Sequence, residues 1–197
     1  LLRQGAKVYA VEPNVRMRAK AETKFMDEPN FVSVPARAED TGLPDGGVDL
    51  VTAAQSFHWF ESVSCRREFK RILRPGGSVM LVWNNRLDDR GDFNIAYELM
   101  LKEHQVDDSR GLSEDELDRR IDFLFSGELK RYDFDNHQHL DLEALRGRLR
   151  SSSYCPRLED PAFVPLMNDL EDLYRIYQNG GKVPMLYRTG VYLGKLK

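Results

Sequence analysis

The sequence predicts an α/β fold built on a mostly parallel sheet. Short apolar stretches alternate with helix-forming stretches through the first half of the chain, at spacings that suit parallel strands joined by crossover connections. The most apolar of these stretches, Val48–Ala54, is interrupted only by Asp49. A run of this kind is typical of a strand that is buried on both faces of a parallel sheet.

The first half is predicted to contain four strands and two helices. Gly5 is placed to stop a helical turn that begins at Leu1, and Asn14 is placed to cap the helix that follows the first strand. Pro75, within Arg74-Pro75-Gly76-Gly77, predicts a sharp turn after the second helix, because proline cannot continue a helix. The predicted strands are 6–11, Phe31–Val34, Val48–Ala54 and 78–83. The predicted helices are 15–25 and a second helix that Ser62 or Ser64 caps and that runs to about Leu73.

The second half is predicted to be richer in helices. Ser113 and Glu116 stand three residues apart, the spacing of a capping box, and predict the start of a helix. Further helices are predicted at 93–105, 142–149 and 162–177, and strands at Leu129–Leu140 and 185–193. Because no repeat or linker interrupts the chain, a single domain over 1–197 is expected.

Composition narrows the classes of partner. A net charge of −3 and a pI of about 5.9 give no general attraction to nucleic acid or to acidic membranes. The two cysteines, Cys65 and Cys155, lack metal-ligand spacing, and no apolar run is long enough to span a membrane. His137 and His139 share one face of a predicted strand, but no further ligand stands nearby, so no metal site is predicted. We expect a cytoplasmic protein, a monomer or a homodimer, that acts on a small molecule.

Two segments that follow predicted strands are candidates for chemistry, because ligands of open α/β sheets bind beyond the carboxyl ends of the strands. Glu12 follows the first strand, where a carboxylate can accept hydrogen bonds from ribose hydroxyls; the alternative is an acid that favours the helix start. Gln55, His58 and Trp59 follow the central strand. His58 suits proton transfer near neutral pH; the alternative is that these aromatic residues belong to the core.

Three segments in this order resemble the central part of class I S-adenosylmethionine-dependent methyltransferases, in particular the small-molecule group that includes trans-aconitate methyltransferase. They are VYAVEPN, ARAEDTGLPDGGVDLVTAAQSFHWF and EFKRILRPGGSVMLVWN. The tail, from Asn136 through SSSY to MLYRTGVYLGKL, resembles the end of the same group. The resemblance implies a Rossmann-like fold with helices on both faces of the sheet and one antiparallel strand near the C-terminus.

The resemblance also implies a site. S-adenosylmethionine would bind within 1–86, and S-adenosylhomocysteine would be the product; residues 87–197 would form a helical insertion and the last strands on the substrate side. The expected cofactor-binding residues are Glu12, Pro13, Asn14, Ala38, Glu39, Ala53, Ala54 and Gln55. His58 is the expected base, and the expected substrate-side residues are Trp59, Trp83, Asn84, Tyr154 and Tyr187.

One part of the family pattern is not found in this sequence. The first strand and its glycine-rich loop are expected upstream of Leu1, because glycines let a cofactor approach the backbone closely. If the protein lacks that loop, the alternative is a degenerate methyltransferase-like module that binds a partner. A second alternative is a nicotinamide-dependent oxidoreductase, which also uses an acid after a strand; the RPGG turn and the expected antiparallel tail disfavour it.

Overall fold

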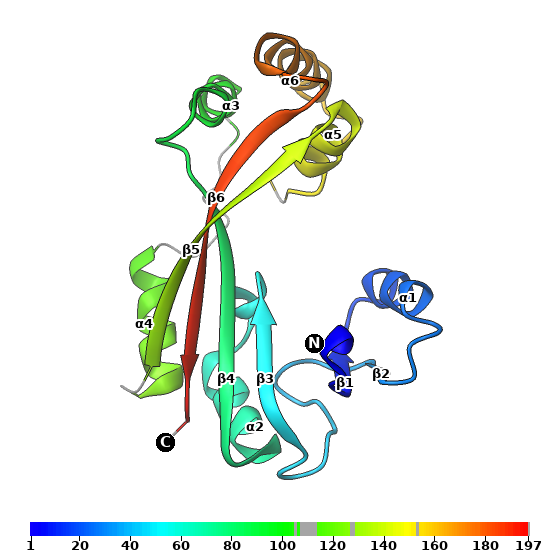
Figure 1. Cartoon of the computed structure of the whole chain (residues 1–197), viewed down its shortest axis with the longest axis vertical. Coiled ribbons are helices and arrows are strands. Elements are labelled where there is room, and N and C mark those ends of the chain that lie inside the picture. Colours follow the sequence, from blue (N-terminus) through cyan, green and yellow to red (C-terminus); the bar gives the residue numbers. More distant parts are fainter. Residues whose placement is uncertain (105, 107–113, 127–128, 153, 197) are drawn as a thin grey trace. The chain divides into compact units, whose positions relative to one another are not determined.

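The computed structural model describes residues 1–104, 106, 114–126, 129–152 and 154–196. Its strands are β1 (Val8–Val11), β2 (Phe31–Val34), β3 (Val48–Ala54), β4 (Leu73–Arg86), β5 (Leu129–Leu140) and β6 (Val183–Gly194). Its α-helices are α1 (Val15–Lys24), α2 (Ser62–Ile72), α3 (Asp92–Glu103), α4 (Glu114–Phe125), α5 (Leu142–Arg150) and α6 (Phe163–Tyr177), and short 3-10 helices cover Leu2–Gln4 and Phe57–Trp59 (Figure 1). Among the described residues, no helix is long and apolar enough to cross a membrane.

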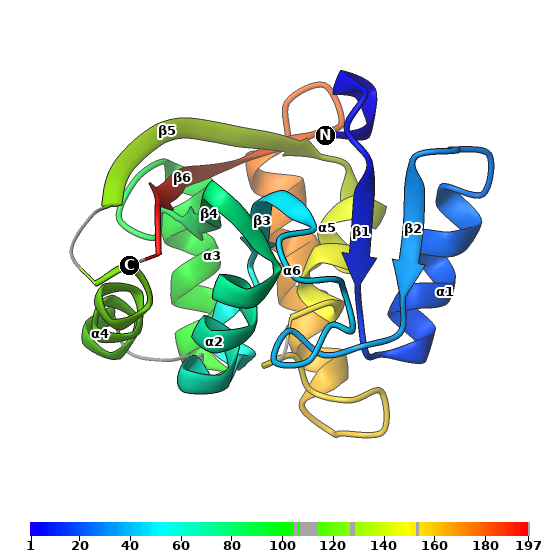
Figure 2. The same cartoon turned by 90° about the horizontal axis from the view of Figure 1, so that it is seen from below.

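The strands form two sheets. β1 and β2 pair in parallel, with Val8 opposite Phe31 and Val11 opposite Val34, and α1 connects them (Figure 2). The other four strands have the order β3-β4-β6-β5, and the arrow of β6 runs opposite to that of β5 (Figure 1). The predicted α/β fold with an antiparallel strand near the C-terminus is confirmed.

The chain divides into two compact units. The first unit holds Leu1–Met80, Arg119–Leu129 and Leu193–Lys197, and the second holds Leu81–Asp118 and Lys130–Tyr192. The single domain expected from the sequence therefore stays a prediction. Each unit has its own buried apolar residues.

The core of the first unit lies between the strands and two helices. α2 carries an apolar face every three or four residues, and Cys65, Phe69 and Ile72 on that face are buried. α4, although it is distant in sequence, contributes Ile121, Leu124 and Phe125 to the same unit. Arg66 of α2 fastens the end of α4, donating from Nε to the Leu124 carbonyl (3.1 Å) and from Nη2 to Ser126 Oγ (2.8 Å).

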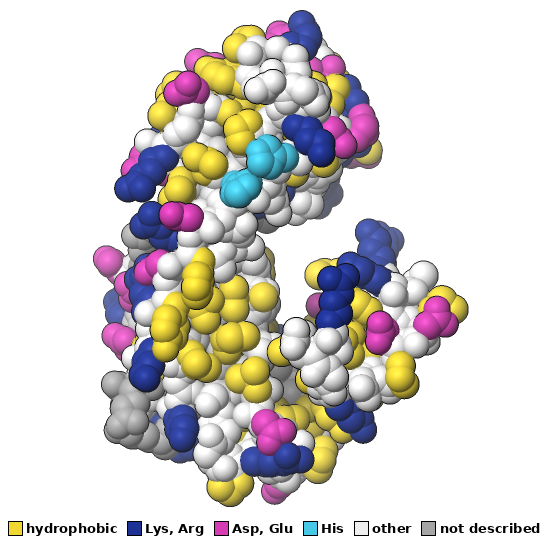
Figure 3. Space-filling view, in the orientation of Figure 1, with side chains coloured by type: hydrophobic (Ala, Val, Ile, Leu, Met, Phe, Trp, Pro, Cys, Tyr) yellow, Lys and Arg dark blue, Asp and Glu magenta, His cyan; other side chains and the backbone are white. Residues whose placement is uncertain are grey.

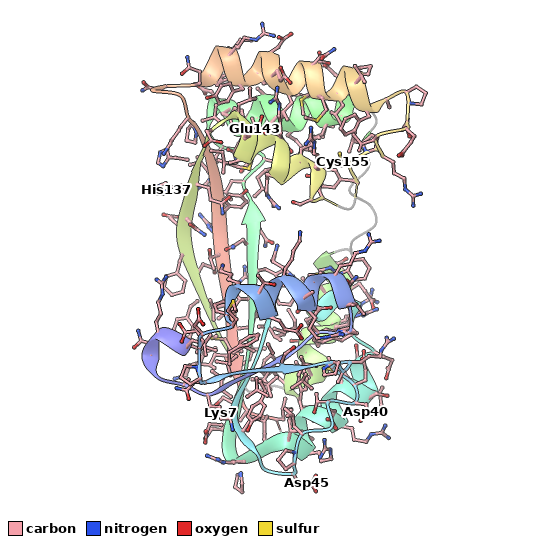
Figure 4. The ribbon with its side chains drawn as sticks, turned by 90° about the vertical axis from the view of Figure 1, so that its right-hand side faces the viewer. Lys7, Asp40, Asp45, His137, Glu143 and Cys155 are labelled. Atoms are coloured by element: carbon pink, nitrogen blue, oxygen red, sulfur yellow. The ribbon has the colours of Figure 1, made fainter. Side chains whose placement is uncertain are left out.

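The second unit holds the larger apolar cluster. α6 packs against α3 and α5, and Figure 4 shows it lying across them. Tyr97, Leu145, Leu166, Leu170 and Met185 are almost fully buried in this cluster. Burial of this number of large side chains stabilises the unit by tens of kcal/mol before the entropy cost of ordering the chain, at roughly 25 cal/mol per Å² of apolar surface.

Local signals at the N-terminal turns were predicted correctly. Gly5 stops the Leu2–Gln4 turn with a φ of 79°, and Asn14 Oδ1 accepts hydrogen bonds from the backbone N–H groups of Arg16 (2.9 Å) and Met17 (3.1 Å). The capping box at Ser113 lies outside the described residues.

Three predictions about the central segment are wrong. β3 is not buried on both faces: among its residues only Ala53 is buried, and in the described part of the sheet β3 lies at the edge beside β4. Neither Ser62 nor Ser64 caps α2; the cap is Glu61, whose carboxylate accepts from the N–H groups of Val63 and Ser64. The Pro75-Gly76-Gly77 turn is not separate from the strand, since β4 starts at Leu73 and contains Gly76 at a φ of 82°.

A buried carboxylate joins the 41–47 loop to α2. Glu68 is 6% exposed, and its Oε1 accepts from the Thr41 N–H (2.9 Å), the Thr41 hydroxyl (2.5 Å) and Arg71 Nη2 (2.7 Å). Arg71 Nη1 donates onward to the Leu43 carbonyl (2.7 Å) and to Asp45 (2.6 Å), and Figure 4 marks Asp45 in the loop. The hydrogen bonds from Arg71 are the main cause that lowers the pKa of Glu68 from 4.5 to about 2, with those from Thr41 adding to it.

We expect replacement of Glu68→Gln to lower the free energy of unfolding at pH 7 by about 2 kcal/mol, because a charged acceptor is lost from a buried network whose Arg71 side is partly exposed. The ionised Glu68 stabilises the fold above pH 4.5, and this contribution is lost as the pH falls from 4.5 towards 2. The stability difference between the wild type and the variant should therefore shrink over that range in urea titrations. Lys70→Gln, an exposed change on the same helix, is the control; a difference that stays constant down to pH 3 would contradict the assignment.

Candidate active site

The segment after β3 is held in shape from both sides. Gln55 has a φ of 52°, a left-handed conformation that few residues other than glycine adopt, and it turns the chain out of the strand. Phe57 then enters the core and is fully buried, with edge-to-face contact to Phe60 at 5.9 Å between ring centroids. Phe60 meets Phe69 of α2 in the same way at 6.4 Å. The aromatic side chains that the alternative placed in the core are thus Phe57 and, in part, Phe60.

Burial of Phe57 leaves the next two side chains at the surface of the 3-10 turn. Trp59 is 66% exposed, and His58 is half-buried with its ring centroid 4.8 Å from that of Trp59. Arg120 of α4 donates from Nη1 towards the backbone carbonyls of Phe60 (3.3 Å) and His58 (3.5 Å). Sequence reasoning missed Arg120, because nothing in its local pattern shows that α4 packs beside a turn some 60 positions earlier.

The environment keeps His58 neutral at physiological pH. Burial lowers the pKa of the imidazole below 6.5, since it disfavours the charged form, and the positive charge of Arg120 lowers it further. A neutral imidazole beside an exposed indole has a free electron pair with which to accept a proton. The arrangement therefore suits a general base.

Glu39 lies against this turn. Its Oε1 accepts from the Glu61 N–H at 2.8 Å, immediately after Phe60, and its Oε2 stands 3.4 Å from Nε of the exposed Arg37. Ala38 and Glu39 occupy the corner of a tight turn that the Asp40 N–H closes on the Arg37 carbonyl at 3.2 Å. The structure thus brings Ala38 and Glu39 next to the segment that contains His58.

Glu12 and its neighbours form a separate group. Glu12 Oε1 accepts from the Asn14 N–H at 2.7 Å, which ties the carboxylate to the start of α1. Its Oε2 accepts no hydrogen bond from the described residues and remains open to a ligand. Pro13 and Asn14 are exposed, and no hydrogen bond between described residues links this group to Glu39 or His58. Ala53 is buried, whereas Ala54 and Gln55 are exposed.

The expected substrate-side residues of the second unit fall into two places. Trp83 is buried, with edge-to-face contact to Tyr192 at 5.8 Å, and Asn84 Oδ1 accepts from Thr189 Oγ1 at 2.6 Å, so both lie among the strands. Tyr154 and Tyr187 come together elsewhere, around Arg148 of α5. His137 and His139 are exposed, with ring centroids 5.0 Å apart, and Figure 3 shows histidine side chains gathered on the surface.

The comparisons with known proteins find methyltransferases. Residues 1–81 match the family model described as a methyltransferase domain. Residues 1–81 are therefore similar to methyltransferase domains. An uncharacterized methyltransferase of Mycobacterium tuberculosis is 38% identical over 90 residues, which are 46% of this chain and 35% of that protein. One of Schizosaccharomyces pombe is 36% identical over 83 residues, 42% of this chain and 32% of that protein.

Solved structures extend the likeness of the methyltransferase fold to almost the whole chain. A putative type II methyltransferase from Anaeromyxobacter dehalogenans matches with a TM-score of 0.61 at 20% identity, over 96% of this chain and 80% of that one. A putative methyltransferase from an antibiotic biosynthesis pathway of Anabaena variabilis gives 0.54 at 23% identity, over 96% and 82%. The second half therefore shares the Rossmann-like methyltransferase fold. The matched part spans only about a third of the length of the curated relatives.

We expect Arg120→Met to raise the pKa of His58, because it removes the positive charge that lowers it while much of the burial stays. The shift is measured by following the His58 ring resonances in a pH titration by NMR. Arg119→Met, a change at the neighbouring exposed position, should leave that pKa where it is. An unchanged His58 pKa in the Arg120 variant would show that burial alone sets it.

Proposed function

We propose that the protein transfers a methyl group from S-adenosylmethionine to a small-molecule acceptor. The observation that carries this proposal is the match of residues 1–81 to the methyltransferase domain, together with the polar and aromatic groups that follow β3. The nicotinamide and degenerate-module alternatives gain no support from these comparisons.

The described residues fit part of the cofactor. An open carboxylate oxygen on Glu12, at the end of a parallel strand, suits the hydroxyls of a ribose. Ala38, Ala53 and Ala54 have short side chains, which leave room for a ligand beside the backbone. Glu39 is already bonded to Glu61 and Arg37, so an adenine amine would have to compete with the exposed Arg37 for Oε2. We therefore assign ribose binding to Glu12 and assign adenine contact to Ala38 and Glu39.

The cofactor would supply a methyl group that is already electrophilic because it is bound to a sulfonium. The protein would have to position the acceptor, exclude water and, where the acceptor carries a proton, remove it. His58 is held neutral and faces no acid partner in its recorded contacts, so it suits that last role. Trp59, exposed beside it, would cover the bound acceptor.

Calorimetric binding of S-adenosylhomocysteine tests the proposal directly. It should be measured on residues 1–197 and on the complete product of the gene, whatever its length. We expect the complete product to bind. Failure of both forms, with both folded, would favour the degenerate module.

In the form that binds, Glu12→Gln should lower the affinity for S-adenosylhomocysteine by about tenfold, because hydrogen bonds to a charged acceptor contribute roughly 1.5–3 kcal/mol. Glu28→Gln is the matched control, because it removes one negative charge from an exposed position of the same unit. Equal affinity of the Glu12 variant and the wild type would remove Glu12 from the site.

His58→Asn should lower turnover by about a hundredfold for an acceptor that must lose a proton, while S-adenosylhomocysteine affinity stays unchanged. The measurement is transfer of labelled methyl to acceptors found in a small-molecule screen. His139→Asn, at an exposed position on β5, is the control. Full turnover of the His58 variant would show that this residue is not the base.

A further inference from the structure

The second unit contains three phenol groups near the guanidinium of Arg148. Arg148 of α5 donates from Nε to the Tyr187 hydroxyl at 3.2 Å, and its guanidinium carbon stands 5.9 Å from the centroid of that ring. Tyr154 packs against the apolar cluster that contains Tyr97 and Tyr187, and the charge of Arg148 acts on both Tyr154 and Tyr97. Tyr97 also lies under the guanidinium of Arg86, 4.8 Å from its ring centroid. Figure 4 marks the neighbourhood through Glu143, on the same helix, and Cys155, in the loop beside Tyr154. We call Arg148, Tyr97, Tyr154 and Tyr187 the Arg148 cluster.

The cluster is rigid on its inner side. Tyr187 is 3% exposed and donates its hydroxyl proton to Met185 Sδ at 2.8 Å, and Tyr97 is 1% exposed. Burial raises the pKa of Tyr97 far above its usual range, and the proximity of Tyr154 raises it further, so the Tyr97 phenol stays neutral. The outer side is open, because Arg148 is exposed and Tyr154 is half-exposed.

Arg148 lacks the acidic partner that several other arginines of its unit have. Several of them are paired with acids: Arg86 with Glu98, Arg131 with Asp133, Arg146 with Glu143 and Glu171, Arg175 with Asp172 and Arg188 with Asp135. Arg148 has no ion pair with any residue in the described part of the chain, and its recorded neighbours are phenols. Nε is used by Tyr187, which leaves the two terminal NH₂ groups as donors.

The charge of Arg148 is secure. The Arg148 side chain is exposed over much of its length, but its guanidinium is partly desolvated beside Tyr187, which works against the charge. The hydrogen bond to Tyr187 and the neighbouring phenol oxygens outweigh this effect and raise the pKa of Arg148 above its usual value. A fixed guanidinium fork beside a hydroxyl matches the geometry of a carboxylate or phosphate, which accept two parallel hydrogen bonds. A simpler reading is that Arg148 only favours the C-terminal end of α5, as Arg150 does two positions later. Arg150, by contrast, lies over the face of Phe163, with its guanidinium carbon 5.9 Å from the ring centroid.

We propose that Arg148 and the Tyr154 hydroxyl bind a small anion that carries a carboxylate or a phosphate, with Tyr187 and Tyr97 holding them in place. This site lies within the second unit and does not rest on the proposed function. It makes Arg148 the residue that selects ligands bearing a carboxylate or a phosphate over neutral ones.

The test uses the whole chain without methyl donor. Sodium succinate, inorganic phosphate and the neutral succinamide are titrated in turn while the Arg148 side-chain and Tyr154 ring resonances are followed by NMR. We expect saturable shifts with succinate or phosphate and none with succinamide. The anion that binds more tightly identifies whether the natural ligand carries a carboxylate or a phosphate.

Variants separate binding from packing. Arg148→Met should lower the affinity for the anion by at least about tenfold. Tyr154→Phe should lower it by a smaller factor, because a charged donor contributes more than a neutral one. Arg150→Met is the matched control and should bind like the wild type. Should Arg148→Met fail to fold, Arg148→Lys keeps the charge but loses the planar fork, and should still weaken binding.

Two results would overturn the site: no saturable shift with either anion, or equal loss in the Arg148 and Arg150 variants. The outcome is separate from that of the cofactor experiment. An anion held by Arg148 in a protein that never binds S-adenosylhomocysteine would keep the oxyanion site and remove methyl transfer.

Discussion

The first unit depends on the pairing of Glu68 with Arg71. This pair gathers the 41–47 loop, which has few apolar side chains of its own, onto a helix whose other face is in the core. The loop leads directly into β3, so the position at which the strand starts follows from these hydrogen bonds. The turn that contains His58 and Trp59 directly follows β3, so its position also depends on these hydrogen bonds. A buried ion pair of this kind specifies one arrangement of a loop that hydrophobic burial alone would leave undetermined.

Much of the fold was predictable because local signals and tertiary structure agree. Asn14 caps α1, and Gly5 ends the 3-10 turn at Leu2–Gln4. Both were predictable because they act through hydrogen bonds and dihedral angles within a few residues. The errors arise where the environment decides. The composition of β3 is that of a strand covered on both faces, yet strand order, which composition does not encode, leaves it at the end of its sheet.

The site was predictable in part for the same reason. The sequence places His58 and Trp59 directly after β3, and their contacts within the turn follow from a few residues. Arg120 and Arg148 were not found, because each acts on a segment that is far away in the chain or reached through a helix face. Their effects depend on which carbonyl or phenol the folded chain presents to them, and no short motif records that. Trp83, which is expected near the substrate, is buried with its ring edge-to-face against Tyr192, a contact that the local sequence does not reveal.

The contribution of α4 to the first unit bears on how the gene can be divided. The family match ends at residue 81, but the turn that carries His58 is braced by a helix beginning at residue 114. A protein fragment cut at the end of the match would lose Ile121, Leu124 and Phe125, which are buried in the same unit, and the hydrogen bond from Arg66 of α2 to the Leu124 carbonyl. Such a fragment would expose apolar surface, and it would lose the positive charge of Arg120 beside His58. Residues 1–80 and 119–129 should therefore be kept together in fusions, domain exchanges and circular permutants.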